Sequence, residues 1–156
     1  MDERKIRVLN VIDDYNRECI VATGSLSYPS TKVIKALNAA IELYGKPKYI
    51  RTDNGPEFIS KDYKRWCKKM DITRIYSEPG KPMQNGIIER FNKTFREDIL
   101  DAYYLRSVKH FNEIADGWKQ DYNQYHPHKS LGKKSPQEFA KRRKPLFGVL
   151  KPQRVA

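Results

Sequence analysis

The sequence predicts a layered α/β domain in which helices pack on a mixed β-sheet. Two β-rich runs joined by a polar turn open the chain, and helix-like and strand-like periodicities then alternate through its middle. The chain has 156 residues, of which 38% are hydrophobic, so it can build one core of ordinary size but not two. Alternating elements of this kind place helices against the faces of a sheet.

The first two strands are expected over residues 6–13 and 18–23, because both runs are rich in β-branched and aliphatic side chains. The polar residues between them predict a tight turn and therefore an antiparallel hairpin. Asp13 and Asp14 stand at this turn. We interpret them as turn formers rather than as catalytic acids.

A helix and a short strand follow the hairpin. Ser30 is placed to cap a helix whose apolar residues recur at helical spacing over 33–44, and a glycine and a proline stand just after it. Residues 48–52 predict a strand, which the turn-forming sequence Asp-Asn-Gly-Pro at 53–56 ends at once. Asp53 is therefore expected at the carboxyl end of a strand.

The second half of the chain continues the alternation and then becomes helical. The capping-box sequence Ser-Pro-Gln-Glu at 135–138 predicts the start of a short last helix, and a loose tail should follow it. The expected elements are a helix over 61–70, a strand over 72–76, a rigid polar loop over 77–82, and helices over 84–100 and 108–125.

The charge of the chain indicates a polyanionic partner. Lys and Arg number 31 against 19 Asp and Glu, a formal net charge of +12. From residue 129 onward nine Lys and Arg stand against Glu138 alone, so this segment contributes +8 of that excess. A short basic run is often only a solvated surface. The asymmetry and the aromatic residues between the cations favour contact with nucleic-acid phosphates, and such binding weakens with salt.

Neither a membrane segment nor a disulfide framework is indicated. No run reaches the roughly 18 consecutive apolar residues that a membrane span requires, and the first residues lack the apolar region of a signal peptide. Cys19 and Cys67 are 48 positions apart and form no metal-binding pair. We therefore expect a cytoplasmic protein with two buried thiols.

Asp53 is the first candidate functional residue. Ligand sites in open α/β sheets form beyond the carboxyl ends of the strands, where this carboxylate should lie. The spacing alone does not decide its role, because an aspartate before Asn-Gly also commonly binds the amides of its own turn.

The helix expected after residue 84 carries the second candidate, Glu89. Residues three and four apart lie on one face of a helix, so this helix should have a buried stripe and a polar stripe beside it. The buried stripe is Ile88, Phe91, Phe95 and Ile99, and the polar stripe is Glu89, Asn92, Lys93 and Arg96. Glu89 and Lys93 could form an exposed ion pair worth about 0.2–0.5 kcal/mol. Alternatively, Glu89 holds a metal beside phosphates that Asn92 and Arg96 contact.

Two runs resemble the catalytic core of bacterial insertion-sequence transposases of the OrfB type (the IS-three group), relatives of retroviral integrases. They read RTDNGPEF over 51–58 and PGKPMQNG over 79–86, and the second leads into Glu-Arg-Phe-Asn at 89–92. The 35 residues between Asp53 and Glu89 match the interval between that family's second and third acidic ligands. Segments at 101–103, 121–123 and 135–139 also resemble the family's downstream pattern.

The resemblance implies an RNase H-like fold and cleavage and strand transfer at the ends of a transposon, dependent on Mg²⁺ or Mn²⁺. It makes Asp53 and Glu89 catalytic metal ligands, and DNA ends, target DNA and self-association the expected interactions. His128 matches a family position too, and we interpret it as structural. With the basic run at 141–144, the DNA-binding residues expected are Lys81, Asn85, Asn92, Lys93, Arg96, Lys141, Arg142, Arg143 and Lys144.

The resemblance also divides the chain and marks one departure. It makes residues 1–105 the catalytic core, 106–144 a helical extension and 145–156 a basic tail. The family's first acidic ligand lies on a central strand, and its match would fall upstream of Met1. We therefore expect a truncated sheet without that strand, and a chain that binds DNA but cleaves little of it. The alternatives left open are a non-catalytic DNA-binding protein that regulates transposition and a nuclease that only hydrolyses.

Overall fold

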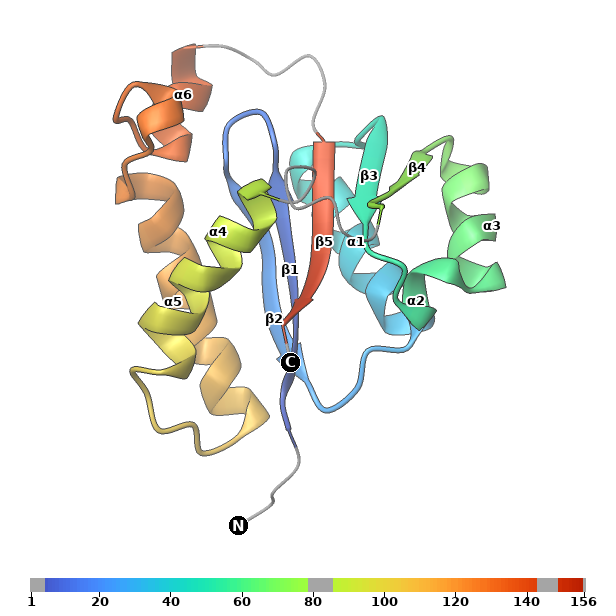
Figure 1. Ribbon diagram of the computed structural model, residues 1–156, viewed down its shortest axis with the longest axis horizontal. Helices are drawn as coiled ribbons and strands as arrows, with labels where there is room; N and C mark the ends of the chain where they lie inside the picture. The colour runs from blue at the N-terminus through green and yellow to red at the C-terminus, as the bar shows by residue number, and fades with distance from the viewer. Residues whose placement is uncertain (1–4, 79–85, 143–148, 156) are drawn as a thin grey trace.

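A five-stranded mixed sheet runs through the middle of the molecule (Figure 1). The computed structural model describes residues 5–78, 86–142 and 149–155. The strands are β1 (Arg7–Asp13), β2 (Cys19–Ser25), β3 (Tyr49–Thr52), β4 (Thr73–Tyr76) and β5 (Val149–Val155). Their order in the sheet is β2-β1-β5-β3-β4. β1 is antiparallel to β2 and β5, whereas β3 is parallel to β4 and β5. The predicted layered α/β class is confirmed.

The predicted hairpin is present, and its first strand is buried on both faces. Along β1 side chains alternate between the faces of the sheet. Leu9 and Val11 join the core beneath α1 (Ser30–Tyr44), while Val8 and Ile12 join the core on the opposite face. A strand buried on both faces reads as a continuous apolar run, which is why the hairpin could be predicted from the sequence.

Three helices cover one face of the sheet (Figure 1). They are α1, α2 (Pro56–Ile59) and α3 (Lys61–Met70). α3 has the predicted bounds, and the Ser60 hydroxyl caps it by accepting a hydrogen bond from the Tyr63 N–H. Ser30 was predicted to cap α1, but this was wrong, because Pro29 is the cap position and no side chain caps it. The short helix α2 lies where only a turn was predicted.

The other face carries two long helices that pack through aromatic rings. They are α4 (Gly86–Phe95), which continues through a π-helical turn over Arg96–Leu100, and α5 (Val108–Tyr125). The predicted buried stripe of α4 is confirmed, since all four of its members are buried. Phe91 meets Tyr122 edge to face at 5.2 Å between ring centroids, and Phe95 meets Trp118 in the same way at 5.1 Å. These contacts fix the rotation of α4 about its axis and thus decide which residues it presents to solvent.

α5 also satisfies the free backbone of the sheet edge formed by β2. The Asn123 side chain accepts a hydrogen bond from the Cys19 N–H at 2.7 Å and donates one to the Cys19 carbonyl at 2.9 Å. Asn112 makes the same pair of bonds with Gly24, at 2.7 and 3.1 Å. A Cβ at Gly24 would lie 2.5 Å from the ring of Phe111, so this approach requires glycine. The edge strand is therefore covered rather than left open.

The end of the chain differs from the loose tail that we predicted. The capping box is confirmed, since the Glu138 N–H and the Ser135 hydroxyl lie 3.4 Å apart at the start of α6 (Pro136–Arg142). Residues Val149–Val155, however, form β5 between β1 and β3. This is the central position that we expected to be vacant.

Two physical reasons account for the difference. Without a strand between them, β1 and β3 would both leave backbone groups unpaired inside the sheet, and β5 supplies their partners. The strand could not be predicted, because Pro152 stands in its middle, opposite Val11, and a proline argues against a central strand. Two cations of the predicted basic tail, Lys151 and Arg154, lie in β5.

Two minor predictions can be compared with the structure directly. Cys19 and Cys67 are both free and buried, as expected. Among the residues that the structure describes, no helix combines the length and apolar character needed to cross a membrane.

Candidate active site

The loop after β3 holds Asp53 half-buried at the carboxyl end of the strand, as predicted. Its Oδ1 accepts a hydrogen bond from the Gly55 N–H at 2.8 Å, so the carboxylate does serve its own turn. One oxygen bound to an amide leaves the other oxygen's lone pairs for a further partner. The turn interpretation and a ligand role are therefore compatible at this residue.

Glu57 is a second carboxylate, just after this loop, and no role was predicted for it. It lies in the first turn of α2 and is only 4% exposed. A Cβ placed on Gly55 would lie 2.8 Å from Glu57 Oε1 and 2.9 Å from Asp53 Oδ1, so the two carboxylates flank the same glycine. The signal that could have revealed Glu57 is its position just after a proline at the first helical position.

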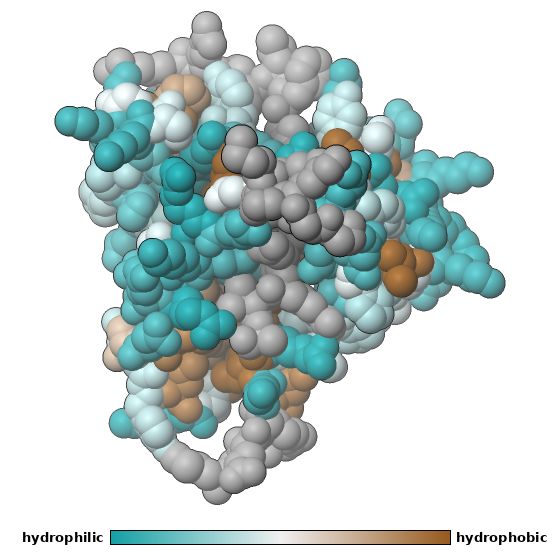
Figure 2. Space-filling view, in the orientation of Figure 1, coloured by the Kyte–Doolittle hydropathy of each residue, from teal (hydrophilic) through white to brown (hydrophobic). Residues whose placement is uncertain are grey.

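The polar stripe predicted on α4 forms a continuous flank of this helix, which we call the acidic flank: Glu89, Asn92, Lys93 and Arg96. Glu89, Lys93 and Arg96 are exposed and Asn92 is half-buried. The outer surface over α4 is hydrophilic (Figure 2). Lys93 pairs with Glu97 at 4.0 Å rather than with Glu89, and both side chains are largely exposed. Such a pair adds little stability.

A buried asparagine fastens the acidic flank to the sheet. Asn10 on β1 is fully buried, and its Nδ2 donates a hydrogen bond to Asn92 Oδ1 at 3.0 Å. We had expected Asn92 to contact phosphates, but its amide oxygen is engaged with the protein. Asn92 and Glu89 are one turn apart, so the bond also sets where Glu89 lies relative to the strands.

β5 lies between the strand that carries Asn10 and the strand that precedes Asp53. Asn10 on β1 pairs with Gln153 on β5, and Ile50 on β3 pairs with Leu150, three residues away along β5. The pairing of β3 with β5 ends at Ile50, and Asp53 lies just beyond the end of β3. Asp53 thus follows β3, Glu89 lies on a helix bonded to β1 through Asn92, and β5 separates these two strands in the sheet.

The hairpin acid Asp13 stands level with the middle of β3 rather than with its end. Asp13 pairs with Leu150, which also pairs with Ile50, three residues before Asp53. Its Oδ1 accepts a hydrogen bond from the Tyr15 N–H at 2.8 Å, which is the turn-forming role we assigned to it. Burial raises the pKa of Asp13 from 3.8 to about 6.

The remaining predicted DNA-binding residues fall on two parts of the chain. Lys81, Asn85, Arg143 and Lys144 lie outside the described residues. Lys141 and Arg142 lie in the last turn of α6. The structure therefore places Glu57 beside Asp53, keeps the acidic flank on one side of α4, and places the described part of the basic run on a separate helix.

His128 is the histidine that we interpreted as structural. It is half-buried between α5 and α6, and its ring meets Tyr122 edge to face at 5.4 Å. Burial, and the nearby charges of His126, Arg17 and Arg90, lower its pKa from 6.5 to about 4. Its backbone pairs with that of Lys134, so the residue has a structural role. Its side-chain nitrogen Nε2 has no hydrogen-bond partner among the described residues.

Comparison with protein families gives two overlapping matches. Residues 1–82 and residues 70–136 each match an integrase core domain family. The chain is 36% identical over 137 residues to a 39.2 kDa insertion element IS476 protein of Xanthomonas euvesicatoria, covering 88% of this chain and 40% of that protein. It is 35% identical to a 31.7 kDa insertion element IS407 protein of Burkholderia multivorans, covering 50% of it. The chain thus spans half or less of these relatives.

Solved structures of low sequence identity share the fold. The HTLV-2 integrase catalytic core domain, solved in complex with magnesium, aligns with a TM-score of 0.67 at 22% identity and covers 89% of this chain and 87% of that one. The catalytic core domain of BIV integrase aligns with a TM-score of 0.69 at 21% identity, covering 88% and 87%. The RNase H-like architecture that the sequence motifs predicted is therefore confirmed, and the chain belongs to the integrase core domain family, among whose members its relatives are proteins of bacterial insertion elements.

Proposed function

We propose that this chain is the catalytic-core region of an insertion-element transposase, and that Asp53 and Glu89 hold a divalent metal ion for cleavage and joining of DNA. The observation that supports the proposal is the topology: Asp53 follows β3, Glu89 lies on a helix bonded to β1 through Asn92, and β5 separates these two strands in the sheet. The activity, DNA substrates and partners of the whole protein belong to this proposal.

The donor set fits the proposed ion. Mg²⁺ and Mn²⁺ prefer oxygen ligands, and Mg²⁺ is commonly bound by one or two carboxylates together with substrate phosphates. Asp53 has an oxygen beyond the one that serves its turn, and Glu89 is exposed on its helix. A bound ion would supply charge neutralisation at a phosphodiester and activation of an attacking hydroxyl.

The protein's own groups have defined parts in this arrangement. The Gly55 amide orients the Asp53 carboxylate, and the bond from Asn10 to Asn92 fastens α4 to β1. Lys93 and Arg96, one and two turns from Glu89, present positive charge on the same flank, where a DNA backbone would pass. The net charge of +12 supports association with DNA of any sequence.

Metal binding tests the proposal without requiring activity. Mn²⁺ added to the full chain should broaden NMR signals from the loop after β3 and from the first turns of α4. Asp53→Asn and Glu89→Gln should each weaken this effect, because each removes a ligand. Glu113→Gln is the matched control, since Glu113 is exposed on α5. Broadening that survives both ligand variants would contradict the site.

Cleavage assays address the reaction itself. The assay uses Mg²⁺ and labelled DNA that carries the ends of the element, and it compares the parent chain with Glu89→Gln. Strong cleavage that Glu89→Gln abolishes would support the metal site and contradict the need for a third acid. Cleavage indifferent to Glu89→Gln would contradict the proposed chemistry.

A non-catalytic DNA-binding role is the second candidate, and one observation favours it. Within residues 5–78, 86–142 and 149–155, no group of three or more His, Cys, Asp or Glu side chains is placed to hold a metal ion. In that case DNA binding would persist in the Asp53→Asn and Glu89→Gln variants, and Mn²⁺ would produce no local broadening.

Self-association is a further part of the proposal. Similar structures include a dimeric form of the HTLV-2 integrase catalytic core domain and an intasome of a simian T-cell lymphotropic virus. We expect this chain to form at least a dimer at high concentration. Sedimentation analysis over a concentration series measures it, and a monomer at every concentration would contradict it.

A further inference from the structure

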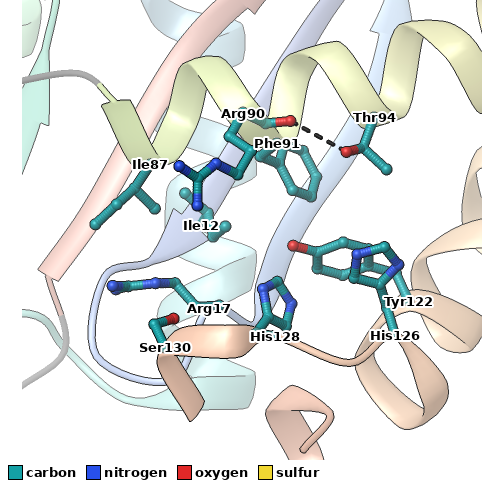
Figure 3. Close-up of a pocket in the computed structure, with 10 residues that line it drawn as sticks. All are labelled: Ile12, Arg17, Ile87, Arg90, Phe91, Thr94, Tyr122, His126, His128 and Ser130. Carbon is teal, nitrogen blue, oxygen red and sulfur yellow. Dashed lines mark hydrogen bonds between the residues drawn. The ribbon is translucent and has the colours of Figure 1, made fainter. Parts of the chain in front are cut away.

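A small cavity lies beside α4 on the flank opposite the acidic flank (Figure 3). Its floor is made by Ile12 on β1, Phe91 on α4 and Tyr122 on α5. Its rim carries Arg17 from the turn between β1 and β2 and Arg90 from α4. Three segments that are distant in the sequence therefore build one concave site.

The charged groups at this cavity are all basic. Arg17 and Arg90 reach it from two sides, and His126 and His128 line it from the chain that leaves α5 (Figure 3). None of the residues that line the cavity is acidic. Two arginines facing one space without a carboxylate between them repel each other, and an anion bound there would relieve the repulsion.

His128 adds a buried polar atom that requires a partner. Its Nε2 is buried and has no hydrogen-bond partner in the described part of the chain. Leaving such a group unsatisfied costs about 1–3 kcal/mol, and native proteins rarely do so without a reason. The groups that depress the pKa of His128 are its burial, His126, Arg17 and Arg90, so every charge that acts on it is positive.

The size of the cavity limits what can occupy it. Its volume is about 110 Å³, whereas pockets that enclose a whole small-molecule ligand measure roughly 300–1,000 Å³. A nucleobase with its sugar would exceed it, but a single compact oxyanion would fit. Ser130, exposed at the rim, places a hydroxyl donor beside the arginines.

We propose that this cavity binds one phosphate group of a DNA backbone, with Arg17 and Arg90 as its ionic contacts and Ser130 and His128 as hydrogen-bonding groups. The inference rests on the proposed function, because it takes DNA as the partner. It adds a contact that is separate from the metal ligands. Arg90 follows Glu89 directly in the sequence, so the cavity and the proposed metal site are carried by the same first turns of α4.

Such a contact would set the path of DNA relative to Glu89. Glu89 and Arg90 are adjacent in α4 and both are exposed, so a backbone seated in the cavity reaches the acidic flank across the solvent-facing side of the helix. A phosphate fixed on one flank would restrict which phosphodiester reaches the other. Phosphate contacts act in this way to fix register without reading sequence.

Charge removal with a distant control tests the proposal. Binding of a fluorescent DNA duplex is measured by anisotropy with EDTA present, so that the result does not depend on the metal ligands. Arg17→Gln/Arg90→Gln should weaken binding about tenfold or more and reduce the slope of log affinity against log salt by about 1. Arg106→Gln is the control, because Arg106 precedes the opposite end of α5 and is exposed. Equal effects of these variants, each scaled per charge removed, would overturn the site.

A second pair of variants, each of which adds one carboxylate, separates an effect on DNA binding from an effect on folding. Ser130→Asp adds a carboxylate at the exposed rim and should weaken binding as strongly as loss of an arginine, whereas Ser27→Asp adds the same charge at an exposed position in the loop before α1. Thermal unfolding checks that both variants fold. Similar binding by the two variants would overturn the proposal.

The His128 ring distinguishes DNA from free phosphate. An anion in the cavity stabilises the protonated imidazole, so the pKa of His128, measured by NMR, should rise from about 4 when DNA is added. Inorganic phosphate at the same phosphate concentration should raise it less. No rise with DNA, or an equal rise with inorganic phosphate that DNA does not displace, would overturn the inference. The metal-binding result is unaffected by either outcome, so the two proposals fail separately.

Discussion

The two flanks of α4 differ in how much of their surroundings the protein itself provides. The acidic flank presents Glu89, Lys93 and Arg96 to solvent, and its fixed point is the bond between Asn10 and Asn92. The opposite flank, with Ile87, Arg90 and Thr94, faces a cavity floored by aromatic rings and closed by histidines. One flank is an open surface, whereas the other is a built concave site.

This difference indicates that the two flanks of α4 bind their ligands in different ways. An open flank with one exposed acid and two exposed cations depends on groups brought from outside, such as a metal ion and a nucleic-acid backbone. A concave site formed by three chain segments has its donors already in place, so a ligand meets little reorganisation on binding. The packing shared by the two flanks is the buried stripe of α4, and disturbing it should affect both.

The largest expected effect comes from Phe91, whose ring lies under both flanks. It is 3% exposed and contacts the rings of Phe95, Trp118 and Tyr122. Phe91→Ala removes these contacts and leaves a cavity, so the free energy of unfolding should fall by about 3–5 kcal/mol. Urea unfolding followed by circular dichroism measures it.

An exposed aromatic residue provides the control for this substitution. Tyr125, at the end of α5, is 72% exposed, and Tyr125→Ala should change the free energy of unfolding by less than about 0.5 kcal/mol. If Phe91→Ala were as mild as Tyr125→Ala, the ring cluster would not be what holds α4 in place.

The acidic flank could be predicted from the sequence because it needs only one periodicity. Residues at spacings of three and four share a helix face, so the polar stripe of α4 followed directly from the printed order of residues. Asp53 could be placed at a strand end for a similar local reason. Their placement around one continuous sheet depends on strand pairing through β5, which a proline in that strand argued against.

The cavity on the other flank could not be predicted, because no local pattern contains it. Arg17 belongs to the hairpin turn, Arg90 to α4 and His128 to the chain after α5, and only the packing of α4 against α5 brings them together. His128 was therefore interpreted as structural. Glu57 was not predicted either, but for a different reason. The turn-forming residues just before it explained the local sequence pattern without giving Glu57 a role.

The second-largest effect is expected from Asp13, which lies at the turn that carries the cavity residue Arg17. Its carbonyl accepts a hydrogen bond from the Arg17 N–H at 2.9 Å, so the turn it forms positions a rim arginine. Burial raises the pKa of Asp13 to about 6 in the folded protein, against an ordinary 3.8. The folded state then holds the proton more tightly than the unfolded state, and stability falls as pH rises from about 4 to about 6.

Asp13→Asn removes this charge and keeps an oxygen that can accept from the Tyr15 N–H. At pH 7 the variant should be more stable than the parent by about 1–3 kcal/mol. At about pH 4 the two should differ little, because the parent is then largely protonated. Thermal unfolding across this range measures the difference, and a gap that does not change with pH would contradict a buried, charged Asp13.

The smallest effect concerns the link between the acidic flank and the sheet. In the bond from Asn10 to Asn92, Asn10 is buried but Asn92 is only half-buried. When Asn10 is lost, the Asn92 side chain can therefore form hydrogen bonds with water instead. A double-mutant cycle with Asn10→Ala and Asn92→Ala should therefore give a coupling energy of about 0.5–1.5 kcal/mol. A coupling near zero would mean that packing of the buried stripe alone sets the level of Glu89. In that case the acidic flank would owe its position to the same rings that build the cavity, and the two flanks would differ in exposure but not in how they are held.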